Sequence, residues 1–393
     1  MTSIFQAADH HNLTFADLWA QHNEHRIFFP NIVLTVNAYL THWNVKEELL
    51  INFAFSLVTA LMLYLFVLSK IKQRYLAGTA AVLIAAWFFS PVQFENWLWG
   101  WQVEWFMAVA GNVTAIYLLD RYASTKRKSR LLLGGAIASA VIATFSLGSG
   151  ILVWPVGLGI LLLYRQRRRP IVTWLVAAVL STSAYYYNYH KPPTDPSTTL
   201  FLHQPKNFVK YILTYFGRPV SSVPDLSMLM GAIFLLLAIP LVYMVWLRRS
   251  KISKFVPWLS LMVLALLAGS LTALSRLGFG VAQGSASRYT AFSLLYVIGL
   301  TGLICALLDT TKLNRSNGLF VVLVALAVST PLLFSSYSDG RTGFKIESAN
   351  TRVISSCTHV PNPTDACLLL TYPHADVARP RLEYLKTKHW AGY

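Results

Sequence analysis

Charged residues are scarce in this chain. Only 12% of its 393 residues are Asp, Glu, Lys or Arg, whereas a soluble domain has about 25%. The apolar share is 55%, and several uncharged windows run for about 17–22 residues, the length that a helix needs to cross a bilayer. The shortage of charge therefore excludes an ordinary soluble domain and predicts a membrane protein.

Acidic residues are rarer than basic ones, at 16 against 33, and the formal net charge is +17. In a soluble protein this excess would suggest a nucleic-acid partner. Here the basic residues fall in short clusters between apolar segments, which is the pattern of cytoplasmic loops in membrane proteins. We therefore exclude nucleic acid as a partner and assign the positive charge to loops at the membrane surface.

Cysteine is rare, and several catalytic motifs are missing. Cys305 lies in an apolar segment and is expected to be inert, whereas Cys357 and Cys367 lie ten residues apart in a polar region. They are expected to form a disulfide if that region faces an oxidising compartment. The chain has no nucleophile elbow, and the glycines at 278–280 follow no strand, so they are not a nucleotide-binding fingerprint. Residues 1–48 also lack the features of a signal peptide.

The apolar segments predict an all-α, polytopic transmembrane helix bundle of about ten spans. We place the spans near 49–69, 76–91, 104–119, 131–147, 149–164, 171–187, 226–247, 255–275, 290–308 and 318–335. The fourth and fifth are separated only by a glycine-containing turn at 147–150, so they are expected to form a tight hairpin.

Three regions follow from these spans. Residues 1–48 form an external polar segment with an amphipathic helix over 31–41, residues 49–335 form the transmembrane domain, and residues 336–393 form a small external appendage. In the appendage we predict a short strand over 367–373 and a helix over 379–388, which makes it a small α/β unit.

The basic clusters occupy alternate loops, and this alternation predicts the topology. Because positive loops stay in the cytoplasm, both termini are expected to lie outside. No span precedes residues 1–48 to carry them across, so we expect a further helix upstream of Met1. The basic loops lie at 70–74, 121–130, 165–169, 248–254 and 312–315.

The densest polar cluster lies near the N-terminus. Ten residues contain two carboxylates, two imidazoles and a guanidinium, from Asp17, His22, Glu24, His25 and Arg26. One interpretation is a solvated loop or short helix that caps the next helix. The other is a carboxylate with its neighbours facing a pocket at the membrane edge. On a helix, the two imidazoles at i and i+3 would share a face.

The same imidazoles, together with His10, His11 and His42, raise the possibility of a divalent metal site. Imidazole combined with carboxylate suits zinc or manganese. The spacing matches no strong metal-binding pattern, so a metal cofactor stays an alternative.

A loop rich in tryptophan follows the second span. Four tryptophans within nine residues are typical of an aromatic belt at the membrane interface, or they form a platform for a sugar or an isoprenoid. Polar residues favour the platform slightly, because a belt does not need them. The candidate site residues in this loop are Glu95, Asn96, Trp97, Trp101 and Gln102.

Arg276 and Arg288 border a small, glycine-containing external loop. A guanidinium can hold a phosphate with two parallel hydrogen bonds. The alternative is that both arginines only anchor the loop at the interface. Arg288 lies just before a predicted span, so it is expected at the depth of a lipid phosphate.

Four segments resemble those of poorly characterised bacterial polytopic membrane proteins, and the resemblance covers nearly the whole chain. The overall layout is similar to that of the GT-C superfamily of membrane glycosyltransferases, which use polyprenyl-phosphate-linked sugars. The segments are Trp19 to Pro30, Glu95 to Trp97 with Gln102, Gly148 to Gly150 with Trp154 and Pro155, and Ser287 to Tyr289.

The resemblance implies a transferase in the bacterial inner membrane. It would move a sugar from a polyprenyl-phosphate donor to a cell-envelope acceptor on the external face, with Glu24 or Asp17 as general base. Arg288 and Arg276, with Arg26, would hold the leaving lipid phosphate. The alternatives are a non-enzymatic transporter of lipid or polysaccharide and a scaffold for envelope assembly.

The transferase hypothesis makes a geometric demand. Base, sugar and leaving phosphate span only a few ångströms, and positioning supplies much of the rate. We therefore expect Glu24, Glu95 and Arg288 to converge on one outward-facing cavity that is walled by Trp97 or Trp101.

Overall fold

The computed structural model describes residues 2–126, 128–311 and 315–392, and these are helical almost throughout. In chain order, with η for 3-10 helices, the elements are α1 (Thr2–Asp9), α2 (Phe15–Trp19), β1 (Gln21–His22), β2 (His25–Arg26), α3 (Phe28–Thr41), α4 (Val45–Lys70), α5 (Arg74–Phe88), η1 (Pro91–Gln93), α6 (Phe94–Leu98), η2 (Gly100–Gln102), α7 (Val103–Ser124), α8 (Arg130–Thr144), η3 (Gly148–Leu152), α9 (Val153–Leu163), α10 (Arg168–Tyr186), α11 (Leu200–His203), α12 (Pro205–Gly217), α13 (Pro224–Leu247), η4 (Arg249–Lys254), α14 (Val256–Arg276), η5 (Leu277–Phe279), η6 (Val281–Ser285), η7 (Ser287–Tyr289), α15 (Thr290–Leu308), α16 (Arg315–Thr358), α17 (Asp365–Thr371) and α18 (Ala375–Lys388).

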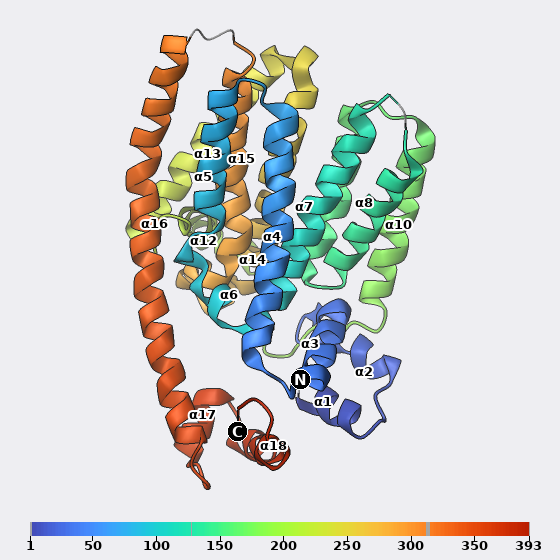
Figure 1. Ribbon diagram of the computed structural model, residues 1–393, viewed down its shortest axis with the longest axis vertical. Helices are drawn as coiled ribbons and strands as arrows, with labels where there is room; N and C mark the ends of the chain where they lie inside the picture. Colours follow the sequence, from blue (N-terminus) through green and yellow to red (C-terminus); the bar gives the residue numbers. More distant parts are fainter. Residues whose placement is uncertain (1, 127, 312–314, 393) are drawn as a thin grey trace.

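The long helices stand side by side as an upright bundle, and both termini lie at its lower end with α1, α2, α3, α17 and α18 (Figure 1). Each of the ten predicted segments forms a helix, which confirms the all-α class. Within the described residues, six helical stretches are long and apolar enough to cross a membrane, so this is a membrane protein. They are Val45–Lys70, Arg74–Leu98, Pro224–Leu247, Val256–Phe279, Ser287–Leu308 and Ser316–Thr358. The count of ten spans and the GT-C layout stay predictions.

The core of the bundle is built around α15, which packs against α14 and α5. Close approach explains a glycine in this helix, because a Cβ on Gly302 would lie 2.1 Å from the Trp258 ring. The predicted hairpin is confirmed by α8, η3 and α9, and its two helices are shorter, at 15 and 11 residues. Dense packing between uncharged helices positions the loops at both ends of the bundle.

The loops with basic clusters lie at the upper end of the bundle, opposite the termini (Figure 1). One cation there is neutralised internally, since Lys70 Nζ lies 2.6 Å from Asp120 Oδ2 and both side chains are buried. The predicted loops also include Arg127 and Lys312, which lie outside the described residues. The two ends of the bundle therefore differ in charge as the alternating loops predict.

The C-terminal region differs from the prediction. α16 continues without a break past residue 335, where the transmembrane domain was expected to end. The predicted strand over 367–373 is wrong, because α17 covers Asp365–Thr371 and the Thr364 hydroxyl caps it by accepting a hydrogen bond from the Cys367 amide. An N-terminal cap of this kind favours a helix. The predicted helix over 379–388 is confirmed within α18, so the described part of the appendage is helical rather than α/β.

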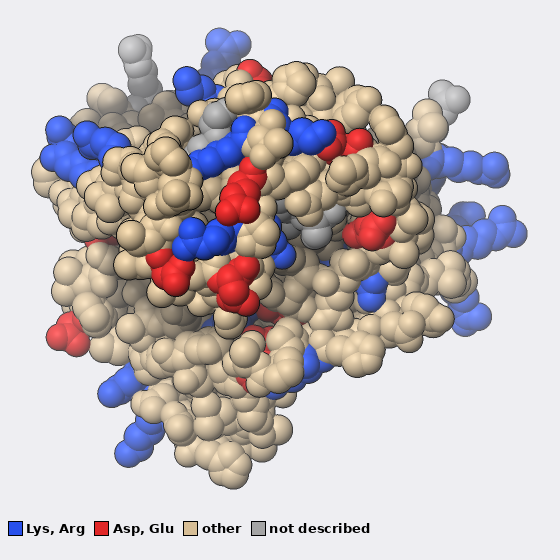
Figure 2. All heavy atoms as spheres, turned by 90° about the horizontal axis from the view of Figure 1, so that it is seen from below, with Lys and Arg blue, Asp and Glu red and all other residues tan. Residues whose placement is uncertain are grey.

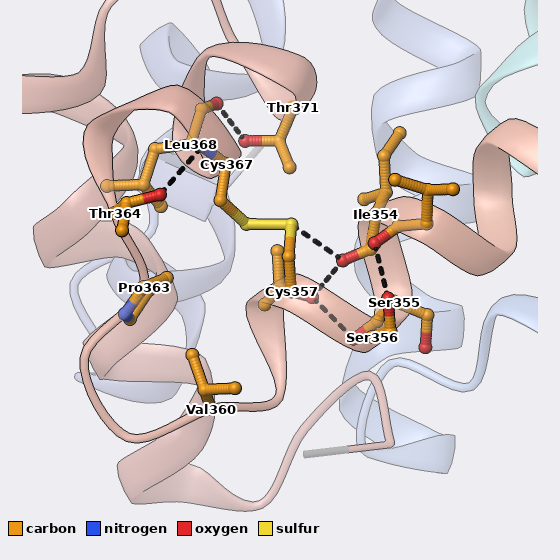
Figure 3. The surroundings of a disulfide bond; sticks show 12 residues. Ile354, Ser355, Ser356, Cys357, Val360, Pro363, Thr364, Cys367, Leu368 and Thr371 are labelled. Carbon is orange, nitrogen blue, oxygen red and sulfur yellow. Dashed lines mark hydrogen bonds between the residues drawn. A yellow bond between two sulfur atoms is a disulfide. The ribbon is translucent and has the colours of Figure 1, made fainter.

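A disulfide joins Cys357, near the end of α16, to Cys367 in α17 (Figure 3). The two Cα atoms lie 5.9 Å apart, within the range that a disulfide requires. The expected pairing is therefore present in the structure, and it ties α17 to the long helix. Cys305 is buried inside α15, as expected.

Candidate functional site

The N-terminal polar cluster forms a hairpin, so the prediction that its histidines share a helix face is wrong. α2 ends at Trp19, and β1 then pairs with β2 in antiparallel register, with His22 opposite His25. Asn23 occupies the turn with φ of 49°, a left-handed conformation that asparagine tolerates better than most residues. The predicted helix over 31–41 is confirmed as α3, which begins at Phe28.

Arg26 holds this hairpin against the end of α10. Its guanidinium donates to the carbonyl oxygens of Trp19 at 2.6 Å, Tyr187 at 2.7 Å and Tyr185 at 3.0 Å, and it lies 5.1 Å from the Trp19 ring centroid. The residue is 4% exposed. These contacts give Arg26 a positioning role and leave its predicted phosphate contact without support.

Glu24 belongs to a cluster of charged side chains from three distant segments. Its carboxylate forms an ion pair with Arg276, at the end of α14, and Arg276 Nη1 also lies 3.3 Å from Asp195 Oδ1. His25 Nε2 lies 3.4 Å from Glu24 Oε1. The side chains of Glu24, Arg276 and Asp195 are between 12% and 20% exposed. One arginine therefore interacts with two carboxylates at this end of the bundle.

The imidazole of His25 is closely surrounded by other residues. A Cβ on Gly148 would lie 2.9 Å from His25 Nδ1 and 3.2 Å from the Tyr185 hydroxyl, so only glycine fits at this point of η3. Burial lowers the pKa of His25 to about 4, and the nearby Asp195 charge opposes this shift. The imidazole is therefore neutral at pH 7.

Arg288 lies beside the tryptophan-rich loop, and two side chains of this loop form hydrogen bonds with its backbone. Its amide donates to Glu95 Oε2 at 2.8 Å, and its carbonyl accepts from Asn96 Nδ2 at 3.1 Å. The guanidinium lies 5.4 Å from the Tyr289 ring and makes no ion pair with any residue that the structure describes. It is close enough to Arg276 for the two charges to act on each other. Arg288 is thus a partly buried cation that forms no ion pair with a described residue, although the charge of Glu95 acts on it.

Several buried polar atoms on the segments around Arg288 lack a hydrogen-bond partner among the described residues. Such groups are nearly always paired in folded proteins, directly or through water, so these segments have unused capacity for a polar ligand or water. The buried carboxylate of Glu104, in the first turn of α7, also acts electrostatically on Arg288. The unpaired atoms are Asn96 Oδ1, Gln102 Oε1, Tyr211 Oη and Thr290 Oγ1.

The two candidate tryptophans have different surroundings. Trp97 packs on Phe106, with ring centroids 4.9 Å apart, and its indole N–H donates to the Ser90 carbonyl, so it belongs to the packing of the loop. Trp101 borders a hollow of about 200 Å³ between the hairpin and the first helices. The hollow is lined by Ile4, Asp17, Ala20, Gln21, His22, Asn31 and Trp101.

The predicted convergence of Glu24, Glu95 and Arg288 has a partial counterpart in the structure. Glu24 binds Arg276, Arg276 is within electrostatic range of Arg288, and Glu95 accepts from the Arg288 amide. None of the three predicted residues lines the hollow beside Trp101, however. Glu24 therefore contacts Arg276, which in turn lies within electrostatic range of Arg288. Asp17 instead lines the hollow, where Thr14 N and Oγ1 donate to its carboxylate.

Asp195 and Tyr185 were missed by the sequence analysis. Asp195 lies in a loop rich in proline and threonine, and it is one of only two acidic residues between positions 188 and 225. That rarity was the available signal. Tyr185 stands in a run of three tyrosines at the end of a span, which resembles an ordinary interfacial belt.

The fold and the polar cluster define a polytopic membrane protein with a charged site at the end of the bundle that carries both termini. Acidic and basic side chains lie close to one another on this end (Figure 2). Among the described residues, no three His, Cys, Asp or Glu side chains are grouped to hold a metal ion. Comparisons of the chain with family models, with curated proteins and with solved structures found no match.

Proposed function

We propose that this protein is a membrane glycosyltransferase that moves a sugar from a polyprenyl-phosphate donor to a hydroxyl group of a cell-envelope acceptor. The proposal rests on two neighbouring arginines that differ in their ion pairs. Arg276 already holds Glu24 and Asp195, whereas the adjacent Arg288 has no ion-pair partner among the described residues. Such a site offers one cation to an incoming phosphate and a carboxylate to an acceptor hydroxyl.

In the proposed reaction, Glu24 takes the proton of the acceptor hydroxyl. The oxygen of that hydroxyl forms a bond to the anomeric carbon of the sugar. The bond between that carbon and the phosphate oxygen breaks, and the electron pair leaves with the lipid phosphate. Arg288, with help from Arg276, stabilises the charge that develops on the phosphate. His25 is neutral, so it adds no competing positive charge beside the base.

Glu24 is a better candidate for the base than Asp17. Hydrogen bonds from Thr14 lower the pKa of the Asp17 carboxyl, which makes it a weaker base. The same hydrogen bonds cap α2, so Asp17 already has a structural role. Glu24 caps no helix and instead pairs with Arg276, which lies within electrostatic range of the arginine proposed to bind the phosphate.

Arg288→Met is expected to weaken the binding of a short polyprenyl phosphate, such as farnesyl phosphate, by about tenfold or more, because a charge-assisted hydrogen bond is lost. Binding is measured by thermophoresis on the purified full-length chain. Arg249→Met is the matched control, since Arg249 also lies over an aromatic ring, that of Trp246 at 5.5 Å, but outside this site. Equal affinity of wild type and Arg288→Met would contradict the proposed phosphate site.

We also propose that the end with the termini faces outward from the bacterial inner membrane. Two features support this orientation: the basic loops lie at the opposite end, and the disulfide lies at the same end as the termini and needs an oxidising compartment. Single cysteines at Ser129 and Ser250 should resist a membrane-impermeant thiol reagent in intact cells, whereas a cysteine at the exposed Ser197 should react. Labelling at Ser129 and Ser250 alone would reverse the orientation.

A further inference from the structure

The hollow beside Trp101 is separate from the charged cluster and has a different chemistry. Its volume of about 200 Å³ is below the ~300 Å³ at which pockets for drug-sized ligands begin. No lysine or arginine lines it, and burial lowers the pKa of His22 to about 4, so Asp17 is the one charged side chain in the lining at pH 7. The hollow is therefore suited to one small, uncharged ligand and not to a phosphate.

The lining combines a flat apolar surface with unused hydrogen-bonding groups. The ring centroids of His22 and Trp101 lie 5.0 Å apart, and neither side chain forms a hydrogen bond with another described residue. Ile4 and Ala20 add apolar surface. Thr14 occupies Oδ2 of Asp17 and leaves its second oxygen available. An indole face beside hydroxyl-binding groups is suited to a sugar ring, which has an apolar C–H face and polar edges.

The walls of the hollow are held in place before any ligand arrives. Asn31 Nδ2 donates to the Leu18 carbonyl at 2.9 Å, which joins α3 to α2. Gln21 Nε2 donates to the His190 carbonyl at 2.6 Å, and Gln21 Oε1 accepts from the His190 amide at 3.0 Å. These bonds fix the hairpin against a distant loop. A preformed site of this kind loses little conformational entropy on binding.

We infer that this hollow binds one uncharged pyranose ring, stacked on Trp101 and hydrogen-bonded by His22 and Asp17. Its assignment to the acceptor rests on the proposed function, because His22 and the proposed base Glu24 lie on one hairpin. The donor phosphate would be bound at Arg288, and the acceptor ring would be bound here. One hairpin thus carries both the proposed base and one wall of the proposed sugar site.

The test uses the full-length chain in an amphipol, because the sugar headgroup of a maltoside detergent would compete. A panel of methyl pyranosides, including glucoside, mannoside and N-acetylglucosaminide, is examined by saturation-transfer NMR and by tryptophan fluorescence titration. At least one pyranoside should bind saturably, and inorganic phosphate should not displace it. Trp101→Ala should weaken binding by about tenfold or more, because the stacking surface is lost.

Trp99→Ala is the matched control, since Trp99 lies in the same loop, is 53% exposed and does not line the hollow. Trp101 also packs against an apolar cluster, so His22→Ala, at an exposed position, is the second variant and should weaken binding by several-fold. The inference is overturned if no pyranoside binds, if phosphate displaces the sugar, or if Trp99→Ala weakens binding as much as Trp101→Ala. The test measures sugar binding in the absence of a donor and of turnover. The proposed transfer reaction can therefore fail while the sugar site is confirmed.

Discussion

Sugar transfer by the Glu24→Gln variant is expected to fall by at least about a hundredfold, with the fold intact, because the amide keeps the shape of the side chain but cannot accept the acceptor proton. Transfer is measured as the initial rate with a polyprenyl-phosphate sugar donor, and folding is checked by the thermal transition of the purified protein. The proton-accepting limb of the pH–rate profile should also disappear, since it reports the ionisation of the base.

Asp195→Asn separates this role from the ion pair itself. Asp195 and Glu24 both contact Arg276, so each substitution removes one carboxylate from the same guanidinium. If Glu24 is the base, Asp195→Asn should slow transfer by no more than about tenfold, as expected for a positioning contact. Equal losses in the two variants would reduce Glu24 to a structural partner of Arg276.

The second large effect is expected on stability, in the Arg218→Met variant. Arg218 follows α12 and its side chain is 3% exposed; its Nη1 lies 2.7 Å from Asp339 Oδ2 in α16, and its Nε donates to the Ser285 carbonyl at 2.6 Å. Removing one partner of a buried pair leaves an uncompensated charge and costs ~3–5 kcal/mol. A lower unfolding midpoint in a denaturant titration would show this loss.

Two further variants control for the chemistry of this pair. Arg379 and Asp365 form an exposed ion pair, with side chains 38% and 72% exposed, so Arg379→Met should cost less than ~1 kcal/mol. The double variant Arg218→Met with Asp339→Leu should recover part of the loss, because it removes the stranded carboxylate. A similar cost for Arg218→Met and Arg379→Met would contradict a buried anchoring pair between the end of α12 and α16.

Local sequence patterns were enough to predict the ten apolar helical segments of the bundle, although they missed α12. Uncharged runs of this length form helices because every backbone polar group must be satisfied within the segment. The cysteine pair was also predictable, since a separation of only ten positions in the chain keeps the two sulfurs near each other. The sequence also predicted that the basic loops share one end of the bundle, because an even number of helices separates each from the next.

Short segments were less predictable than long ones. The leucine run at 368–370 could be a strand or a helix by pattern alone, and the structure makes it helical as part of α17. The N-terminal cluster became a hairpin instead of a helix. Arg26 holds that hairpin through carbonyl oxygens of Tyr185 and Tyr187, which are distant in sequence, so no local signal could have revealed it.

The sequence by itself determined the class of protein, the helices, the alternation of the loops and the types of residue available for chemistry, because these depend on local composition and on solvation by the bilayer. Only the tertiary structure decided which charges meet. It brought Asp195 and Glu24 to one arginine, left Arg288 without an ion pair among the described residues, and separated the Trp101 hollow from both arginines. The physical reason is that ion pairs act over a few ångströms, and helix packing alone sets which loops come that close.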